Sequence, residues 1–433
     1  ATRAPLPPAM ATLARAAQRT LRGAIHRPRA AAAEALTLRS SQASHFAAAA
    51  AATEPLKRTC LYDMHAAAGA KFGPFAGWDM PLQYQGHSVM ASTKHTREKA
   101  SLFDVSHMCP IRLAGADCVA FLETLVVGDI KGLAPGTSTL TVLTNERGGI
   151  IDDSVVTKYT EDELYVVLNA GCRDKDLPHI EKHLSAFQAK GGDCSLHVYD
   201  ERGLVALQGP KAQDALQPLT PGHDLSKLYF GMFIKTQVNG TECFITRTGY
   251  TGEDGFEVSP LVKDTPALCE ALLATGGGET VKWAGLAVRD ATRLEAGLCL
   301  YGNDLDEDTT PVEAGLTWTV GKARRADGGF LGAETILGQI NKEVPVTKRR
   351  VGLSGLKAPA RDHCDILSAD GTKVGEVTSG TYSPSLGKPI AMGYVKPGFN
   401  KAGTELQVVV RGKAGPAVAT KMPFVPAKYH RPE

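Results

Sequence analysis

Two short β-rich runs joined by a turn constrain the fold of this chain more than any other feature. Residues 140–143 and 154–159 are rich in Val, Thr and Leu, and the stretch between them, 145–149, contains Asn and two consecutive glycines. That order of strand-forming and turn-forming residues predicts a β-hairpin. The chain is therefore expected to contain antiparallel sheet.

A second hairpin and two helices are predicted nearby. Residues 243–246 and 256–259 are β-rich, and a polar loop with three glycines joins them. Residues 176–190 carry apolar side chains at helical spacing and end before two glycines, and 286–298 also favours a helix. This mixture of hairpins and helices indicates the α+β class.

The length of the chain predicts more than one domain. Its 433 residues exceed the ~250 to 300 at which single cores stop growing. After a linker expected at 339–348, four β-rich runs bounded by turns predict an all-β barrel or sandwich, at 373–378, 390–395, 405–411 and 417–422. The predicted domains are a body at 57–330, in two parts, and a C-terminal β-barrel domain at 348–429.

The first 53 residues have the composition of an import sequence. They contain seven Arg, no Lys and one acidic residue, Glu34, among many Ala and Ser. This composition predicts a mitochondrial transit segment at 1–53 rather than a secretory signal, and the alternative is an Ala-rich tail without a targeting role. Removing its charges from the totals of 48 basic and 46 acidic residues leaves 41 against 45. The body is mildly acidic, so we expect no nucleic-acid partner and, without a long apolar run, no membrane.

The nine cysteines are scattered, with no C-x-x-C pair. An odd, unpaired set of this kind predicts free thiols in a reducing compartment rather than disulfides or a paired-cysteine zinc site. His179 and His183 lack the H-E-x-x-H pattern, and Asp104, Ser106 and His107 lack a G-x-S-x-G motif. We therefore expect no metal site and no hydrolytic triad.

Adjacent carboxylates follow the first hairpin turn, at Asp152 and Asp153. Alternation along a strand sends them to opposite faces, so one can point into a cleft while the other faces solvent. A single catalytic carboxylate is then more natural than an acid/base pair. The alternative is two acidic turn residues.

Two further groups of polar residues can be functional or structural. The loop of the second hairpin and its following strand carry Arg247, Tyr250, Glu253, Asp254 and Glu257. A buried Glu there would need N–H donors such as an aminopterin ring offers, whereas surface charge around a turn is the alternative. On the helix predicted at 286–298, Arg289 and Arg293 either form a salt-bridged face or supply one guanidinium that holds a ligand carboxylate or flanks its ring.

Seven motifs in order carry a resemblance to a known family. They are SLFDVSHM (101–108), LVVGDI (125–130), GGIIDD (148–153), LVALQGP (204–210), RTGYTGEDGFE (247–257), the stretch 292–307 and KMPFVP (421–426). Nearly all of the chain after the N-terminal segment thereby resembles the T-protein family, the tetrahydrofolate-dependent aminomethyltransferases of the mitochondrial glycine cleavage system. The resemblance implies a mitochondrial matrix enzyme.

The resemblance also implies the reaction and its residues. Aminomethyl-dihydrolipoyl H protein and tetrahydrofolate would give 5,10-methylenetetrahydrofolate, ammonia and dihydrolipoyl H protein, with lipoylated H protein and other components of the system as partners. Asp153 matches the family's catalytic aspartate. The implied folate-site residues are Glu257, Tyr250, Met108, Leu140, Asn169, Tyr301, Trp318, Arg289 and Arg411.

The resemblance implies a fold as well, namely antiparallel sheets with helices, a ferredoxin-like middle part and a C-terminal β-barrel around a central hole. Two other functions belong to relatives of this family. Flavin-dependent dimethylglycine or sarcosine dehydrogenases would need a dinucleotide-binding motif, which is absent here. A non-catalytic folate-binding module that assists iron-sulfur assembly would bind folate without turning over H protein.

Overall fold

A computed structural model describes residues 55–432 of the chain. The predicted transit segment, 1–53, lies outside the described residues. Within the described residues, contacts separate 55–56 with 74–77 from a larger unit, 57–73 with 78–432. All of the sites discussed below belong to the larger unit.

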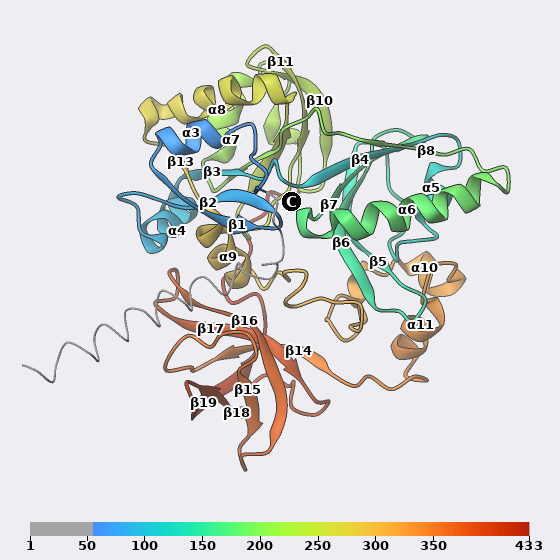
Figure 1. Ribbon diagram of the computed structural model, residues 1–433, viewed down its shortest axis with the longest axis vertical. Coiled ribbons are helices and arrows are strands. Elements are labelled where there is room, and N and C mark those ends of the chain that lie inside the picture. Colours follow the sequence, from blue (N-terminus) through green and yellow to red (C-terminus); the bar gives the residue numbers. More distant parts are fainter. Residues whose placement is uncertain (1–54, 433) are drawn as a thin grey trace, which may run out of the picture. The chain divides into compact units, whose positions relative to one another are not determined.

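One sheet of the larger unit has six strands, and all neighbours but β13 and β3 are antiparallel (Figure 1). In sheet order the strands are β10 (Phe233–Val238), β11 (Thr241–Thr246), β12 (Gly255–Ser259), β9 (Val205–Gln208), β3 (Ala100–Asp104) and β13 (Val281–Trp283). Its core includes Leu207 and Phe256 from the sheet and Leu268 from a helix. The predicted second hairpin is confirmed, with β11 paired to β12.

A second sheet has five strands and contains the first predicted hairpin, β5 and β6. In sheet order the strands are β5 (Thr137–Thr144), β6 (Ile150–Lys158), β7 (Glu163–Leu168), β4 (Cys109–Ala114) and β8 (Ser195–Val198). Helix α6 (Arg173–Gln188) packs Ile180 and Leu184 against this sheet (Figure 1). It begins three residues before the predicted start, because a 3-10 turn, η1 (Ala170–Cys172), leads directly into it.

The C-terminal part is a closed barrel of six strands, drawn in orange to red in Figure 1. In barrel order they are β14 (Arg349–Ser354), β17 (Lys388–Val395), β16 (Lys373–Ser383), β15 (Asp365–Ser368), β18 (Glu405–Val410) and β19 (Lys413–Thr420). The sequence pattern left barrel and sandwich open, and missed β14 and β15. The linker expected at 339–348 is wrong at its start, because α11 (Ala333–Asn341) continues through Gln339, which is buried.

The remaining elements are shorter. The helices are α3 (Tyr62–Ala67), α4 (Val89–Glu98), α5 (Cys118–Leu122), α7 (Ala212–Leu216), α8 (Thr265–Ala274) and α10 (Lys322–Asp327), and β1 (Ala70–Phe75) pairs with β2 (Trp78–Tyr84). Further 3-10 turns lie at Gln217–Leu219, Leu225–Lys227, Val262–Asp264, Thr275–Gly278 and Thr317–Thr319.

Helix α9 (Leu286–Glu295) connects the barrel to the rest of the larger unit. The Glu295 carboxylate is fully buried and accepts hydrogen bonds from Arg97 of α4 and from Ser383 of β16. Two residues earlier, Arg293 donates to Asp304 (2.6 Å) and to Ser379 of β16 (3.0 Å). Breaking a buried ion pair of this kind is costly, so these contacts hold α9, and with it Arg289, in a defined place.

The turn that opens β6 is also held closely. The Asn145 side-chain oxygen accepts from the Gly149 N–H (3.0 Å), while its amide donates to the Glu307 carbonyl (2.9 Å). A Cβ atom at Gly149 would lie 1.8 Å from that same carbonyl oxygen. Glycine at this position is therefore required by the close approach of two backbone segments, just before the adjacent carboxylates.

Gly149→Ala is expected to lower the free energy of unfolding by about 2 kcal/mol, the cost typical of forcing extra atoms into a packed site. The measurement is the thermal unfolding midpoint. Gly222→Ala is the control, because the nearest atom to its added Cβ lies at 3.9 Å. Equal midpoints for the two variants would contradict the packing argument.

The α+β class with a C-terminal barrel is confirmed. All nine cysteines are free and seven of them are buried, as the absence of cysteine pairs predicted. Among the described helices, none combines the length and apolar character that crossing a membrane requires.

Candidate functional site

Strand β6 sends its two adjacent carboxylates to opposite faces of the five-stranded sheet. Asp152 points to the face that α6 covers, where Val156 joins the same core as Ile180, and it is 0% exposed. Asp153, opposite Val142 of β5, is half-buried on the other face. The alternation was predicted correctly. The expectation that the other carboxylate faces solvent is wrong for Asp152, because helix α6 packs over its face of the sheet.

Asn169, which follows β7, joins the two carboxylates. Its backbone N–H donates to Asp152 Oδ2 (3.0 Å) and its side-chain amide donates to Asp152 Oδ1 (2.9 Å). The same amide nitrogen lies 3.2 Å from Asp153 Oδ1 and 2.9 Å from the Asp153 carbonyl oxygen. The orientation of the Asp153 carboxylate therefore depends on a residue that is itself held by Asp152.

The surroundings of Asp153 favour its protonated form. Burial, and then the charge of Asp152, raise the pKa of Asp153 to about 7, while the Asn169 hydrogen bond and the charge of Arg289 act in the opposite direction. A carboxyl group with a pKa near neutral pH can both accept and return a proton.

Arg289 of α9 brings three of the predicted residues together. Its guanidinium lies 4.7 Å from the centre of the Tyr250 ring, and the Tyr250 hydroxyl donates to the Cys299 carbonyl. The charge of Arg289 opposes the rise that burial causes in the pKa of Glu257 and of Asp153. Carboxylates from two different sheets thus face one guanidinium.

Two of these groups lack internal partners. Arg289 Nη1 is buried without a hydrogen-bond partner among the described residues. Within the same part of the chain, no hydrogen bond to the Glu257 carboxylate is found. Buried polar groups are normally paired, so these atoms are available to a ligand with both donors and acceptors.

Other predicted residues line the neighbourhood. Tyr301 donates to the Ile150 carbonyl at the start of β6 (3.2 Å), and Leu140 of β5 pairs with Val155, two residues after Asp153. Met108 packs in the same apolar cluster as Val288, the neighbour of Arg289. These positions are consistent with the walls of one site.

Two predicted residues are not brought to this group. Arg411 lies at the exposed tip of the β18–β19 hairpin, where it and Gly412 both have positive φ, as in a type I′ turn. The predicted strand therefore ends at Val410. Trp318 is 62% exposed, in a 3-10 turn. Within the described residues, no hydrogen bond or ion pair links either residue to Asp153 or Glu257, and their roles stay predictions.

His107, which the sequence motifs exclude from a hydrolytic triad, lies near the site. Burial lowers the pKa of His107 to about 4, with the charge of Arg289 acting in the same direction and Asp104 opposing it. The imidazole is therefore neutral at neutral pH. Asp104 instead contacts His65, whose Nε2 lies 3.0 Å from Asp104 Oδ2. This pairing differs from the hydrolytic triad that was discounted.

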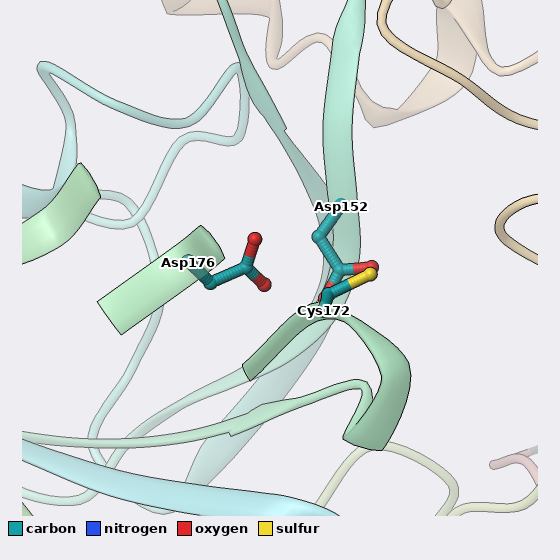
Figure 2. A group of neighbouring side chains, drawn as sticks. All are labelled: Asp152, Cys172 and Asp176. Carbon is teal, nitrogen blue, oxygen red and sulfur yellow. The ribbon is translucent and has the colours of Figure 1, made fainter. Parts of the chain in front are cut away.

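Behind Asp153 lies a second buried acid, Asp176, which the sequence analysis did not single out. Asp176, in the first turn of α6, is 0% exposed, and Figure 2 shows its carboxyl group directed toward Asp152 and Cys172. One carboxyl oxygen of each aspartate and the Cys172 sulfur all lie within 4.8 Å of one another. The sequence signal was present, since Asp176 precedes the buried Ile180 and Leu184 at helical spacing of four.

Comparisons with known proteins agree with this architecture. Residues 61–324 match a family described as "GCVT N-terminal domain", and 348–426 match "Glycine cleavage T-protein C-terminal barrel domain". The chain is 60% identical over 377 residues to "Aminomethyltransferase, mitochondrial" of Flaveria anomala, covering 87% of this chain and 91% of that protein. It is 50% identical over 380 residues to the protein of the same name from Homo sapiens, covering 88% and 92%.

A solved structure is similar throughout its length. The crystal structure of glycine cleavage system aminomethyltransferase T from Bartonella henselae superposes with a TM-score of 0.79 at 41% identity, covering 87% of this chain and 99% of that one.

Proposed function

The chain belongs to the glycine cleavage T-protein family and is an aminomethyltransferase, and from that premise we propose the reaction and residues of its site. The site around Asp153 transfers the one-carbon unit of aminomethyl-dihydrolipoyl H protein to tetrahydrofolate. The products are 5,10-methylenetetrahydrofolate, ammonia and dihydrolipoyl H protein. The observation that carries this proposal is the convergence of Asp153 and Glu257 on Arg289, whose Nη1 is buried without an internal hydrogen-bond partner.

The family uses folate, and the polar groups of this site suit one. In the proposed arrangement, the Glu257 carboxylate accepts the paired N–H groups of the pterin ring. Arg289 lies toward the aminobenzoyl-glutamate side, where its Nη1 has no internal partner. Tyr250, Met108, Leu140, Asn169 and Tyr301 form the walls, and Trp318 and Arg411 are proposed at the margin.

Asp153 is proposed as the group that accepts the proton lost by the attacking folate nitrogen. Bound tetrahydrofolate supplies the nucleophilic nitrogen that attacks the aminomethyl carbon. As an anion, the Asp153 carboxylate first stabilises the positive charge that develops as the C–N bond breaks and the protonated amine leaves as ammonia, and it then accepts the proton that the attacking nitrogen loses. Attack by the second folate nitrogen breaks the C–S bond, and the proton of that nitrogen goes to the departing dihydrolipoyl sulfur. Asn169 holds the carboxylate in place through its side-chain amide.

The location and partners follow from the family. The protein is mitochondrial and works with the glycine cleavage system. We propose the matrix as its compartment, lipoylated H protein as the carrier it meets, and tetrahydrofolate as co-substrate without a metal. The division into a transit segment at 1–53, a body at 57–330 and a barrel at 348–429 is proposed with them.

Aminomethyl-loaded H protein tests the proposed reaction. With tetrahydrofolate present, the native protein is expected to release ammonia and methylenetetrahydrofolate in equal amounts, and omitting either reactant should abolish both products. Binding of folate without product formation would instead favour the alternative, a non-catalytic folate-binding module.

A further inference from the structure

Asp152, Cys172 and Asp176 form a closed group behind the catalytic carboxylate. They come from β6, from the residue before α6, and from the first turn of α6, and all three are buried. Figure 2 shows the Asp176 carboxyl group directed toward Asp152, with the Cys172 side chain lying beside Asp152. Two carboxyl groups confined in this way cannot both ionise without a large electrostatic cost.

The hydrogen bonds identify which carboxyl group is charged. Both Asp152 oxygens accept from Asn169, as a carboxylate does. Asp176 Oδ1 lies 3.2 Å from Lys175 Nζ, but Asp176 Oδ2 is buried with no hydrogen-bond partner among the described residues. An unpaired buried carboxylate oxygen is costly, whereas a protonated Oδ2 could donate to Asp152.

We propose that Asp176 is a positioning residue for the transfer reaction, which keeps a proton on Oδ2 at neutral pH and donates it to Asp152. Asp152 then holds Asn169, and Asn169 holds Asp153. The catalytic part of this inference rests on the proposed function, while the protonation of Asp176 does not.

The electrostatics of the group agree with this geometry. Burial, and then the charge of Asp152, raise the pKa of Asp176 to about 9, and Lys175 opposes the rise. The other titratable groups facing this pair of carboxyl groups are the Cys172 and Cys109 thiols, whose pKa values burial raises, and, across Lys175, Tyr301.

Unfolding measured against pH tests the proton directly. Asp176→Asn retains a donor toward Asp152 and an acceptor toward Lys175, and it cannot ionise. In the native protein the folded state holds the proton up to about pH 9, whereas the unfolded chain releases it near the ordinary value of 3.8. Stability that the native chain has at low pH is therefore lost progressively across this window. The midpoint of Asp176→Asn, relative to native, is expected to rise with pH and level off above about 9.

Asp174→Asn is the matched control, because Asp174 lies in the same first helical turn but is exposed. Its midpoint relative to native should show no such rise. A midpoint of Asp176→Asn that falls relative to native as the pH rises would overturn the proposal, since it would mean that Asp176 is ionised. Stabilisation of the native protein, but not of Asp176→Asn, by added Zn²⁺ would overturn it too. The two carboxyl groups would then share a metal ion and not a proton.

The positioning role is tested with loaded H protein. Asp176→Asn is expected to retain kcat within ~3-fold at neutral pH, whereas Asp176→Leu should lose ~10-fold, the rate equivalent of one buried hydrogen bond. In Asp176→Leu the acid limb of the kcat profile should also move to higher pH, because Asp152 becomes a stronger negative neighbour of Asp153. Loss of activity in folded Asp176→Asn, or an unmoved acid limb in Asp176→Leu, would overturn this role. An inactive native protein would contradict the proposed function and leave the unfolding test valid.

Discussion

Asp153→Asn is expected to lower kcat for aminomethyl transfer by ~100-fold or more, the usual contribution of a positioned acid or base. The amide occupies the same volume but cannot accept the proton released by the attacking nitrogen, and it carries no charge to oppose the cation that forms as ammonia leaves. Because Glu257 and Arg289 are unchanged, tetrahydrofolate should still bind. The measurement is the initial rate of ammonia formation from loaded H protein, together with a folate binding titration.

Asp162→Asn is the control for this change. Asp162 is exposed in the turn between β6 and β7 of the same sheet, and its replacement should leave the rate within ~2-fold. If Asp153→Asn turned over at the native rate, another group would have to accept the proton. If it failed to bind folate, Asp153 would be acting in binding rather than in chemistry.

Arg289→Leu is expected to weaken tetrahydrofolate binding by ~100-fold. The guanidinium is the charge that opposes the rise in the Glu257 pKa, so without it the pKa of Glu257 would rise further and the ionised acceptor would be less favoured. The site would then lose a cationic contact and have a weaker anionic acceptor. Hydrogen bonds to charged groups contribute about 1.5 to 3 kcal/mol each, and 1.4 kcal/mol is tenfold in affinity.

Two further variants are controls for Arg289→Leu. One keeps the positive charge of Arg289, and the other removes an arginine elsewhere in the protein. Arg289→Lys retains the charge without the fork of donors and should recover part of the affinity. Arg173→Leu removes an arginine whose partner, Asp200, is exposed, and it should bind folate as the native protein does. Native affinity in Arg289→Leu would place the folate elsewhere than beside Glu257.

The local patterns of this chain predicted its hairpins well, because strand-forming runs and glycine turns are local signals. The turn before β6 placed Asp153 at a strand start, and the resemblance added its role. The closed barrel was harder to predict. The runs that became β16 to β19 allowed a sandwich equally, since closure depends on β14, which pairs with both β17 and β19.

Tertiary packing accounts for what the patterns missed. Strand alternation shows that Asp152 and Asp153 diverge, but it cannot show that α6 covers Asp152. Nor can it show that Asp176 approaches from a helix 24 residues later. Local pattern also placed Arg411 within a strand, whereas it lies in the exposed turn between β18 and β19.

The dependence of single-turnover transfer on pH tests the role of Asp153 most directly. Only the ionised carboxyl group can accept a proton, and the pKa of Asp153 is about 7 in this site. With loaded H protein and saturating tetrahydrofolate, the rate in the native protein should fall as the pH is lowered through about 7, and this limb should be absent from the residual rate of Asp153→Asn. A native rate that stays level through this range, or an identical limb in the variant, would contradict proton transfer to Asp153.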